Sequence, residues 1–245
     1  MENASTISKK WIFILSGQSN MSGRGGVHAG HWNGAVPTAC HPCNSILRFT
    51  ASSSWEEARD PLHFDIDATK TCGVGPGMPF ATALLPRLPP GSTIALVPCA
   101  IGGTAIREWE RGKKLYNEMV RRSKEAAGDG EIKAVLWYQG ESDTSSEHAA
   151  RSYKLNLERF IGDVRDDLQL HSLPFIQVAL ASGDKQHIEQ VRKAQLGIDM
   201  PNVVCVDAKG LPLKEDHLHL CTEAQVKLGN MLAEAYINHF LSPNA

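Results

Sequence analysis

The sequence predicts a doubly wound α/β fold, in which helices cover both faces of a mainly parallel sheet. Short runs of residues are apolar nearly throughout instead of alternating, as strands buried on both faces require, and helical patterns separate these runs. The runs lie at residues 11–15, 93–98, 132–138, 174–180 and 203–206. No internal repeat or Pro/Ser-rich linker breaks the order, so we expect a single domain over residues 1–245.

The first half of the chain adds one more strand and two helices to this scheme. Residues 45–49 form a shorter apolar run, which we interpret as a sixth strand. Residues 78–88 carry apolar side chains at helical spacing, and residues 113–127 do the same before Gly128. Because glycine commonly ends helices, the second of these helices is expected to stop there.

The second half of the chain contains the clearest helices. Within residues 145–168 apolar side chains recur at steps of three and four, which predicts a helix with one buried face. Residues 222–240 are expected to form the last helix, with Thr222 as its N-cap. Glu223 then lies in the first turn, where the helix dipole stabilises a negative charge.

Residues 22–77 interrupt the alternation of strands and helices. This segment is rich in Gly, Pro, His and Trp and contains at most one predicted strand. Loops of such length inside a compact domain usually carry function. A packed excursion over the edge of the sheet would have the same composition, so the segment is expected to be one or the other.

The composition argues against several classes of protein. Apolar residues make up 42% and charged residues 21% of the chain, which is ordinary for a folded domain and argues against disorder. The formal net charge of -2 provides no field that would attract nucleic acid or an anionic membrane. No apolar run reaches the roughly 18 residues of a membrane helix, and the polar residues 1–10 do not resemble a secretory leader. We therefore expect a cytoplasmic protein with neither a nucleic-acid nor a membrane partner.

The cysteines do not form a recognisable metal site. Cys99 and Cys205 lie in apolar runs and are expected to be buried as small hydrophobic residues. Cys40 and Cys43 have the spacing of a zinc or redox pair, but a zinc site needs a second pair and only Cys72 lies nearby. We interpret Cys40 and Cys43 as loop thiols or an adventitious disulfide.

Polar residues follow four of the predicted strands, at the carboxyl ends where open parallel sheets bind ligands. Ser19 follows the first strand, a glycine pair ending at Gly103 follows the second, and Gln139 follows the third. Asp216 and His219 come after the last strand, past a short loop. A hydroxyl, a flexible glycine turn, a carboxamide, a carboxylate and an imidazole are the parts of an acyl-transfer site.

Each of these groups has a role in such chemistry. A serine hydroxyl becomes a nucleophile when a base takes its proton, and imidazole is the side chain whose pKa lies near neutrality. Asp216, three residues before His219, can fix the tautomer of the ring and stabilise its cation. The Gly103 N–H, the Gln139 NH₂ group and the Ser19 N–H can donate hydrogen bonds to an oxyanion. Taken singly each residue also fits a structural role, and their occurrence at successive strand ends favours catalysis.

Four blocks of sequence carry a family resemblance. They are Gly-Gln-Ser-Asn-Met at 17–21, Gly-Gly-Thr at 102–104, Trp-Tyr-Gln-Gly-Glu-Ser-Asp at 137–143 and Asp-His-Leu-His at 216–219. Their order resembles the SGNH hydrolases, and within them the carbohydrate esterase branch related to acetyl xylan esterases and sialate O-acetylesterases. Trp55 followed by Asp-Pro-Leu at 60–62 fits the same branch. The first and third blocks are the specific ones.

The resemblance implies a three-layer α/β/α sandwich with a flavodoxin-like parallel sheet of about five strands. It implies Ser19 as nucleophile, His219 as base and Asp216 as the acid that orients it, with Gly103 and Gln139 in the oxyanion hole and no metal or other cofactor. The wider superfamily has Asn where this chain has Gln139, which favours the carbohydrate branch. The implied reaction is hydrolysis of a small acyl ester, chiefly O-acetyl, of a carbohydrate or other small alcohol through an acyl-enzyme.

Other interpretations remain open at this point. Gly102 is the alternative to Gly103 as the backbone donor. Asp216, His217 and His219 together could be part of a metal-dependent hydrolase site, and a non-catalytic carbohydrate-binding protein could share the fold.

The sequence indicates less clearly which residues recognise the alcohol part of the ester. Trp32, Trp55 and Trp109 are candidates for stacking on a sugar ring, although packing in the core or in loops fits them better. Glu141 and Asp143 are expected to hold the loop that follows the third strand.

Overall fold

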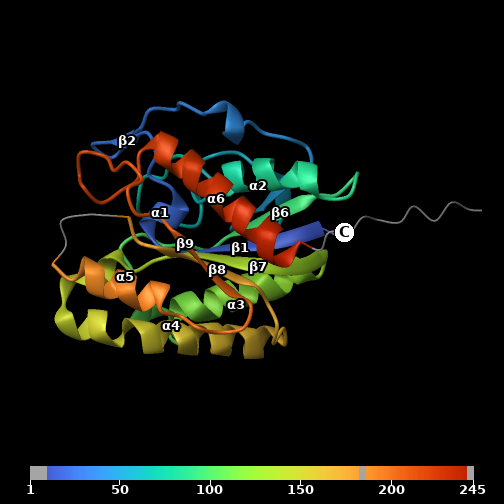
Figure 1. Ribbon diagram of the computed structural model, residues 1–245. Helices are drawn as coiled ribbons and strands as arrows, with labels where there is room; N and C mark the ends of the chain where they lie inside the picture. Colours follow the sequence, from blue (N-terminus) through green and yellow to red (C-terminus); the bar gives the residue numbers. More distant parts are fainter. Residues whose placement is uncertain (1–9, 182–185, 242–245) are drawn as a thin grey trace, which may run out of the picture.

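The computed structural model describes residues 10–181 and 186–241, and these form the expected α/β arrangement (Figure 1). The strands of the central sheet are β1 (Lys10–Gly17), β4 (Ile46–Phe49), β5 (Trp55–Glu57), β6 (Ile94–Pro98), β7 (Gly130–Tyr138), β8 (Phe175–Ala179) and β9 (Val203–Asp207). They lie side by side in the order β5-β4-β6-β1-β7-β8-β9. Every neighbouring pair is parallel except β4 and β5, which run antiparallel.

The sheet is wider than the roughly five strands that were expected. The shorter run at 45–49 is confirmed as strand β4, while β5 was not predicted because an edge strand of three residues leaves no apolar run to detect. Residues 22–77 also contain β2 (Val27–His28) and β3 (His31–Trp32), which form a separate two-stranded sheet. The expectation of at most one strand in this segment is therefore wrong.

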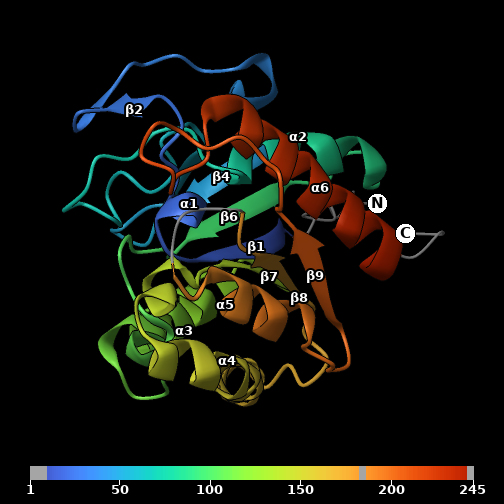
Figure 2. The same ribbon diagram turned by 60° about the vertical axis from the view of Figure 1, so that its left-hand side comes forward.

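Helices cover both faces of the sheet, as Figures 1 and 2 show. On one face lie α2 (Gly77–Leu84) and α6 (Thr222–Phe240), which pack against each other. The other face is covered by α3 (Lys114–Ala127), α4 (Glu147–Leu168) and α5 (Ile188–Leu196). The three layers that the sequence implied are present.

Most helix boundaries follow the predicted signals. Helix α6 spans the predicted residues, but its N-cap is Cys221, and Thr222 is the first helical residue. Helix α4 begins after Ser146, whose hydroxyl accepts a hydrogen bond from Ala149 N–H at 3.2 Å and so caps the helix. Residues Glu141–Ser145, just before this cap, form a 3₁₀ turn, η4. Helix α5 was not predicted.

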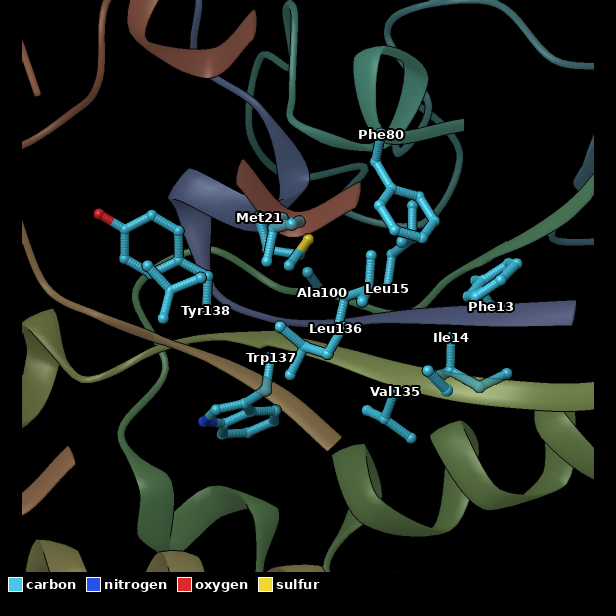
Figure 3. Close-up of a cluster of buried hydrophobic side chains, with 14 of the residues drawn as sticks. Phe13, Ile14, Leu15, Met21, Phe80, Ala100, Val135, Leu136, Trp137 and Tyr138 are labelled. Carbon is cyan, nitrogen blue, oxygen red and sulfur yellow. The ribbon is translucent and has the colours of Figure 1, made fainter. Parts of the chain in front are cut away.

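The core lies on both sides of the central strands, and Figure 3 shows how β7 divides its side chains between the two faces. Val135 and Trp137 point toward the face covered by α3 and α4, whereas Leu136 and Tyr138 point the other way, as strand geometry requires. The ring of Trp137 lies 4.5 Å, centroid to centroid, from Phe160 of α4 and 5.3 Å from Trp109. This packing fixes β7, and with it the residues that follow the strand.

Within residues 10–181 and 186–241, no helix is both long and apolar enough to span a membrane. The polar start of the chain, residues 1–9, on which the expectation about a leader depended, lies outside the described residues.

Candidate active site

Ser19 is the first residue of α1 (Ser19–Ser22), a single helical turn directly after β1. The turn needs glycine at its start, because Gly17 has a φ of +128° and a Cβ there would lie 2.1 Å from the Tyr138 carbonyl oxygen. The N–H groups of Met21 and Ser22 both donate to the Gln18 carbonyl at 2.9 Å, which closes the turn. Ser19 is thereby held rigidly at the carboxyl end of β1.

His219 lies in a tight loop before α6. Leu213 and Leu220 form an antiparallel bridge, and Lys214 N–H donates to the His219 carbonyl at 2.7 Å across the loop. At the tip, Asp216 Oδ1 accepts hydrogen bonds from the N–H groups of Leu218 and His219 at 3.0 and 2.9 Å. The loop therefore folds the Asp216 side chain back onto His219, three positions further along the chain.

The structure brings Ser19, His219 and Asp216 into one hydrogen-bonded row. The Ser19 hydroxyl lies 3.0 Å from His219 Nε2, and His219 Nδ1 lies 2.8 Å from Asp216 Oδ2. These residues come from opposite ends of the chain, and the figures show α1 beside the loop that leads into α6 (Figures 1 and 2). The spacing fits a nucleophile, a base and an acid that orients the base.

The charges of the row follow from its surroundings. Partial burial works to raise the pKa of Asp216, but hydrogen bonds from the N–H of His219, the His219 ring and the N–H of Leu218 outweigh it and hold the pKa at about 2. Burial lowers the pKa of His219 below its usual value, although Asp216 opposes this shift. Near neutrality Asp216 is an anion that can only accept, so neutral His219 carries its proton on Nδ1 and leaves Nε2 free to accept the Ser19 proton.

The glycine turn after β6 presents one free N–H to the same place. Gly102 N–H donates to Asp67 Oδ2 at 3.1 Å, whereas Gly103 N–H has no hydrogen-bond partner among the described residues. Gly103 has a φ of +78°, a conformation that glycine adopts without strain. The turn therefore favours Gly103 over Gly102 as a donor to a bound group.

A buried ion pair supports this turn. Arg24 Nη2 lies 2.5 Å from Asp67 Oδ2, and both side chains are almost completely buried. The Ser22 hydroxyl donates to the same oxygen at 3.0 Å. A Cβ on Gly102 would lie 2.5 Å from Arg24 Nη2, so glycine is needed for this close approach. Sequence reasoning missed Arg24 and Asp67, because their partners are far away in the chain.

Gln139 occupies a different position from the one expected. Its NH₂ group donates to Asp143 Oδ2 at 2.7 Å and the Thr104 carbonyl at 2.9 Å, with Gln18 Oε1 a third neighbour at 3.2 Å. The side chain is fully buried and does not line the cavity beside Ser19. Both amide hydrogens are therefore taken by the protein, and the prediction that Gln139 donates to an oxyanion is corrected. Gln18, directly before Ser19, lines the cavity instead.

Ser19 opens into a cavity of about 370 Å³, which we call the Ser19 cavity. This volume suits a small ligand. Its lining includes Gln18, Ser19, Arg24, Gly103, Glu141 and His219. A larger groove of about 630 Å³ lies elsewhere, between the start of β1 and the end of α6, and contains none of the predicted site residues.

The other sequence candidates lie away from the Ser19 cavity. Trp109 is fully buried in the core, Trp55 packs against Phe49 with tilted rings and donates from Nε1 to Asp129, and Trp32 is partly buried. None of these tryptophans lines the cavity.

The cysteines and the two histidines of the loop form no metal site in the part of the chain described. All six cysteines lie in described segments and are free thiols; Cys99 is buried as expected, whereas Cys205 is partly exposed. Across residues 10–181 and 186–241, no group of three or more His, Cys, Asp or Glu side chains is arranged to hold a metal ion. Both ring nitrogens of His219 are instead engaged by Asp216 and Ser19.

Comparison with known proteins identifies the family. The chain is 59% identical over 98% of its length to a probable carbohydrate esterase of Arabidopsis thaliana, 95% of which is matched. A solved Arabidopsis thaliana structure superposes with a TM-score of 0.92 at 58% identity, covering 95% of this chain and 99% of that one. The structure of NanS shares the fold, with a TM-score of 0.73 at 17% identity, covering 95% and 98% of the two chains. The family model described as carbohydrate esterase, sialic acid-specific acetylesterase, matches residues 9–238, and the chain belongs to this family of carboxylic ester hydrolases.

Proposed function

We propose that the protein is a serine esterase that removes small acyl groups, acetyl foremost, from hydroxyls of carbohydrates. The observation that carries this proposal is the row from Ser19 Oγ through the His219 ring to Asp216, with its distances of 3.0 and 2.8 Å. The family description and the name of the Arabidopsis relative support a carbohydrate ester as substrate. The size of the Ser19 cavity favours a short acyl group.

The proposed reaction proceeds in two halves. His219 Nε2 takes the proton of the Ser19 hydroxyl while Ser19 Oγ attacks the ester carbonyl carbon, and Asp216 stabilises the resulting imidazolium. Collapse of the tetrahedral intermediate breaks the bond to the sugar oxygen, which receives the proton from His219. Water then attacks the acyl-enzyme by the same route and releases the carboxylic acid and free Ser19.

Two backbone donors are proposed for the oxyanion. The N–H groups of Ser19 and Gly103 have no hydrogen-bond partners among the described residues, and both residues line the Ser19 cavity. Losing one such donor typically costs about 10²–10³ in rate. Gln18, whose Oε1 faces Gln139 Nε2, takes the place on the cavity wall that the sequence had suggested for Gln139.

Replacement of Ser19 tests the proposal. Ser19→Ala is expected to abolish hydrolysis of aryl acetates and acetylated sugars while leaving the thermal unfolding temperature nearly unchanged. Ser16→Ala is the matched control, because the Ser16 hydroxyl is buried without a partner among the described residues and lies outside the cavity. Near-full activity in Ser19→Ala would refute the proposal.

A further inference from the structure

The carboxamide of Asn20 holds the backbone on both sides of His219. Its Oδ1 accepts a hydrogen bond from Leu220 N–H at 2.9 Å, and its Nδ2 donates to the Leu218 carbonyl at 3.2 Å. Asn20 is fully buried and follows Ser19 directly in α1. One side chain therefore links the helical turn that carries Ser19 to the loop that carries His219.

The hydrogen bonds of Asn20 define the orientation of its carboxamide. An N–H group can donate only to the carboxamide oxygen, and a carbonyl can accept only from its nitrogen. The Leu220 N–H and the Leu218 carbonyl therefore fix the positions of Oδ1 and Nδ2. The second hydrogen on Nδ2 must then find an acceptor inside the protein, because a buried donor without a partner is costly. That acceptor is Glu141 Oε1, at 2.7 Å.

Glu141 is itself held in place at the end of β7. Gly140, just before it, has a φ of +135°, and a Cβ there would lie 2.9 Å from Gln195 Nε2 and 3.1 Å from the side chain of Val191. The Thr144 hydroxyl donates to the Glu141 carbonyl at 2.7 Å and closes the turn η4. The carboxyl group is therefore a fixed point against which Asn20 is oriented.

We propose that Glu141 is a positioning residue, which sets the His219 ring relative to the Ser19 hydroxyl by holding Asn20. This inference rests on the proposed function, since it concerns how His219, the proposed base, is held in position. In the described part of the chain Glu141 makes no hydrogen bond with Ser19 or His219, and its effect passes through Leu218 and Leu220, on either side of His219. The family resemblance included Glu141 within a block, and the sequence suggested only that it holds its own loop.

The test compares two substitutions of Glu141 in the full chain. Glu141→Gln keeps an oxygen that can accept from Asn20 Nδ2, whereas Glu141→Ala removes the acceptor. Active Ser19 is counted by titration with a fluorophosphonate, and kcat and KM for an aryl acetate are expressed per titrated site. Because misplacement of a catalytic group by about 1 Å can cost about 100-fold, we expect Glu141→Ala to lose about tenfold to 100-fold in kcat, with little change in KM. Glu141→Gln is expected to retain most of kcat.

A matched control separates the loss of kcat in Glu141→Ala from the effect of removing any acidic side chain. Glu147 lies six positions further along, is exposed and pairs with Arg151. Glu147→Ala is expected to leave kcat unchanged. If Glu141→Ala yields too little folded protein, Glu141→Asp carries the test, because it keeps a carboxyl group but withdraws it by one methylene, and it should lose kcat where Glu141→Gln does not.

Two results would overturn the inference without touching the proposed function. The first is an unchanged kcat per titrated site in Glu141→Ala, with only fewer active molecules, which would mean a purely structural role. The second is an equal loss of kcat in Glu141→Gln and Glu141→Ala. Failure of the proposed function would look different, since Ser19→Ala would then remain active and the fluorophosphonate would not label Ser19.

Discussion

Two segments each bring a carboxyl group to the neighbourhood of Ser19, and their surroundings shift the pKa values of the two groups in opposite directions. In the loop before α6, Asp216 is partly exposed and receives hydrogen bonds from two backbone N–H groups and the His219 ring, so its pKa is held at about 2. After β7, Glu141 is buried, its Oε2 has no partner among the described residues, and burial raises its pKa to about 7. Surroundings rather than residue type thus decide which acid is a permanent anion. Of the two, only Asp216 suits a role that demands a negative charge across the neutral range.

Among these carboxyl groups, replacing Asp216 should have the largest effect. Asp216→Asn removes the anion that holds the Nδ1 tautomer of His219, and in a comparable triad this substitution lowers kcat by about 10⁴-fold. Because Asp216 raises the pKa of His219, its loss should also move the acid limb of the pH–rate profile to lower pH. Steady-state kinetics across pH measure both effects. A loss smaller than tenfold, or a limb that moves to higher pH, would contradict the assignment.

A third carboxyl group sharpens the comparison, because Asp67 is as buried as Glu141 but has a cationic partner. Asp67→Ala removes the anionic partner of the buried Arg24 guanidinium and leaves Gly102 N–H without its acceptor. Breaking a buried pair in this way typically costs about 3–5 kcal/mol. We expect denaturant unfolding to show a loss of this size, together with reduced activity.

Two further variants define what the Asp67 result means. The double variant Arg24→Met with Asp67→Leu replaces the pair by apolar side chains and should recover most of the stability. Arg151→Ala breaks an exposed pair and should change the free energy of unfolding by less than about 1 kcal/mol. If Asp67→Ala were as mild as Arg151→Ala, the ion pair would not support the Gly102 turn as described.

A further expected effect concerns how the free energy of unfolding depends on pH. The pKa of Glu141 is raised by folding from 4.5 to about 7, with burial as the main cause and Asp143 adding to it. Its protonated form is thus favoured in the folded state, so its contribution is fully present below pH 4.5 and is lost as pH rises through about 7. Glu141→Gln should therefore gain in free energy of unfolding relative to the native chain between these values. Parallel curves from pH 4.5 to 7 would show that Glu141 ionises normally.

The elements best predicted from sequence are those with long, regular patterns. Helix α6 matches the predicted 222–240, because its apolar positions recur along its whole length. Helix α5 has nine residues and is mostly polar, and β5 has three, so neither leaves a pattern long enough to detect. Short elements of this kind are specified by tertiary contacts rather than by local sequence.

The site shows the same division between local pattern and tertiary contact. The sequence predicted that Ser19, Gly103, Gln139 and the Asp216–His219 loop lie near one another, because the carboxyl ends of parallel strands lie at one edge of the sheet. The role of Gln139 was misjudged, because its position at a strand end does not reveal that Thr104 and Asp143 take its hydrogens. Asn20 lay unassigned inside a recognised block, since its partners are about 120 and 200 residues away.

The central claim is that Ser19 itself carries the acyl group during turnover. An aryl acetate mixed rapidly with the enzyme and quenched in acid should leave one acyl group on the peptide that contains Ser19, detected by mass spectrometry, with a burst of phenol equal to the number of active sites. The adduct should be absent from Ser19→Ala and present in Ser16→Ala. An acyl group on another residue, or turnover with neither burst nor adduct together with an active Ser19→Ala, would contradict the account.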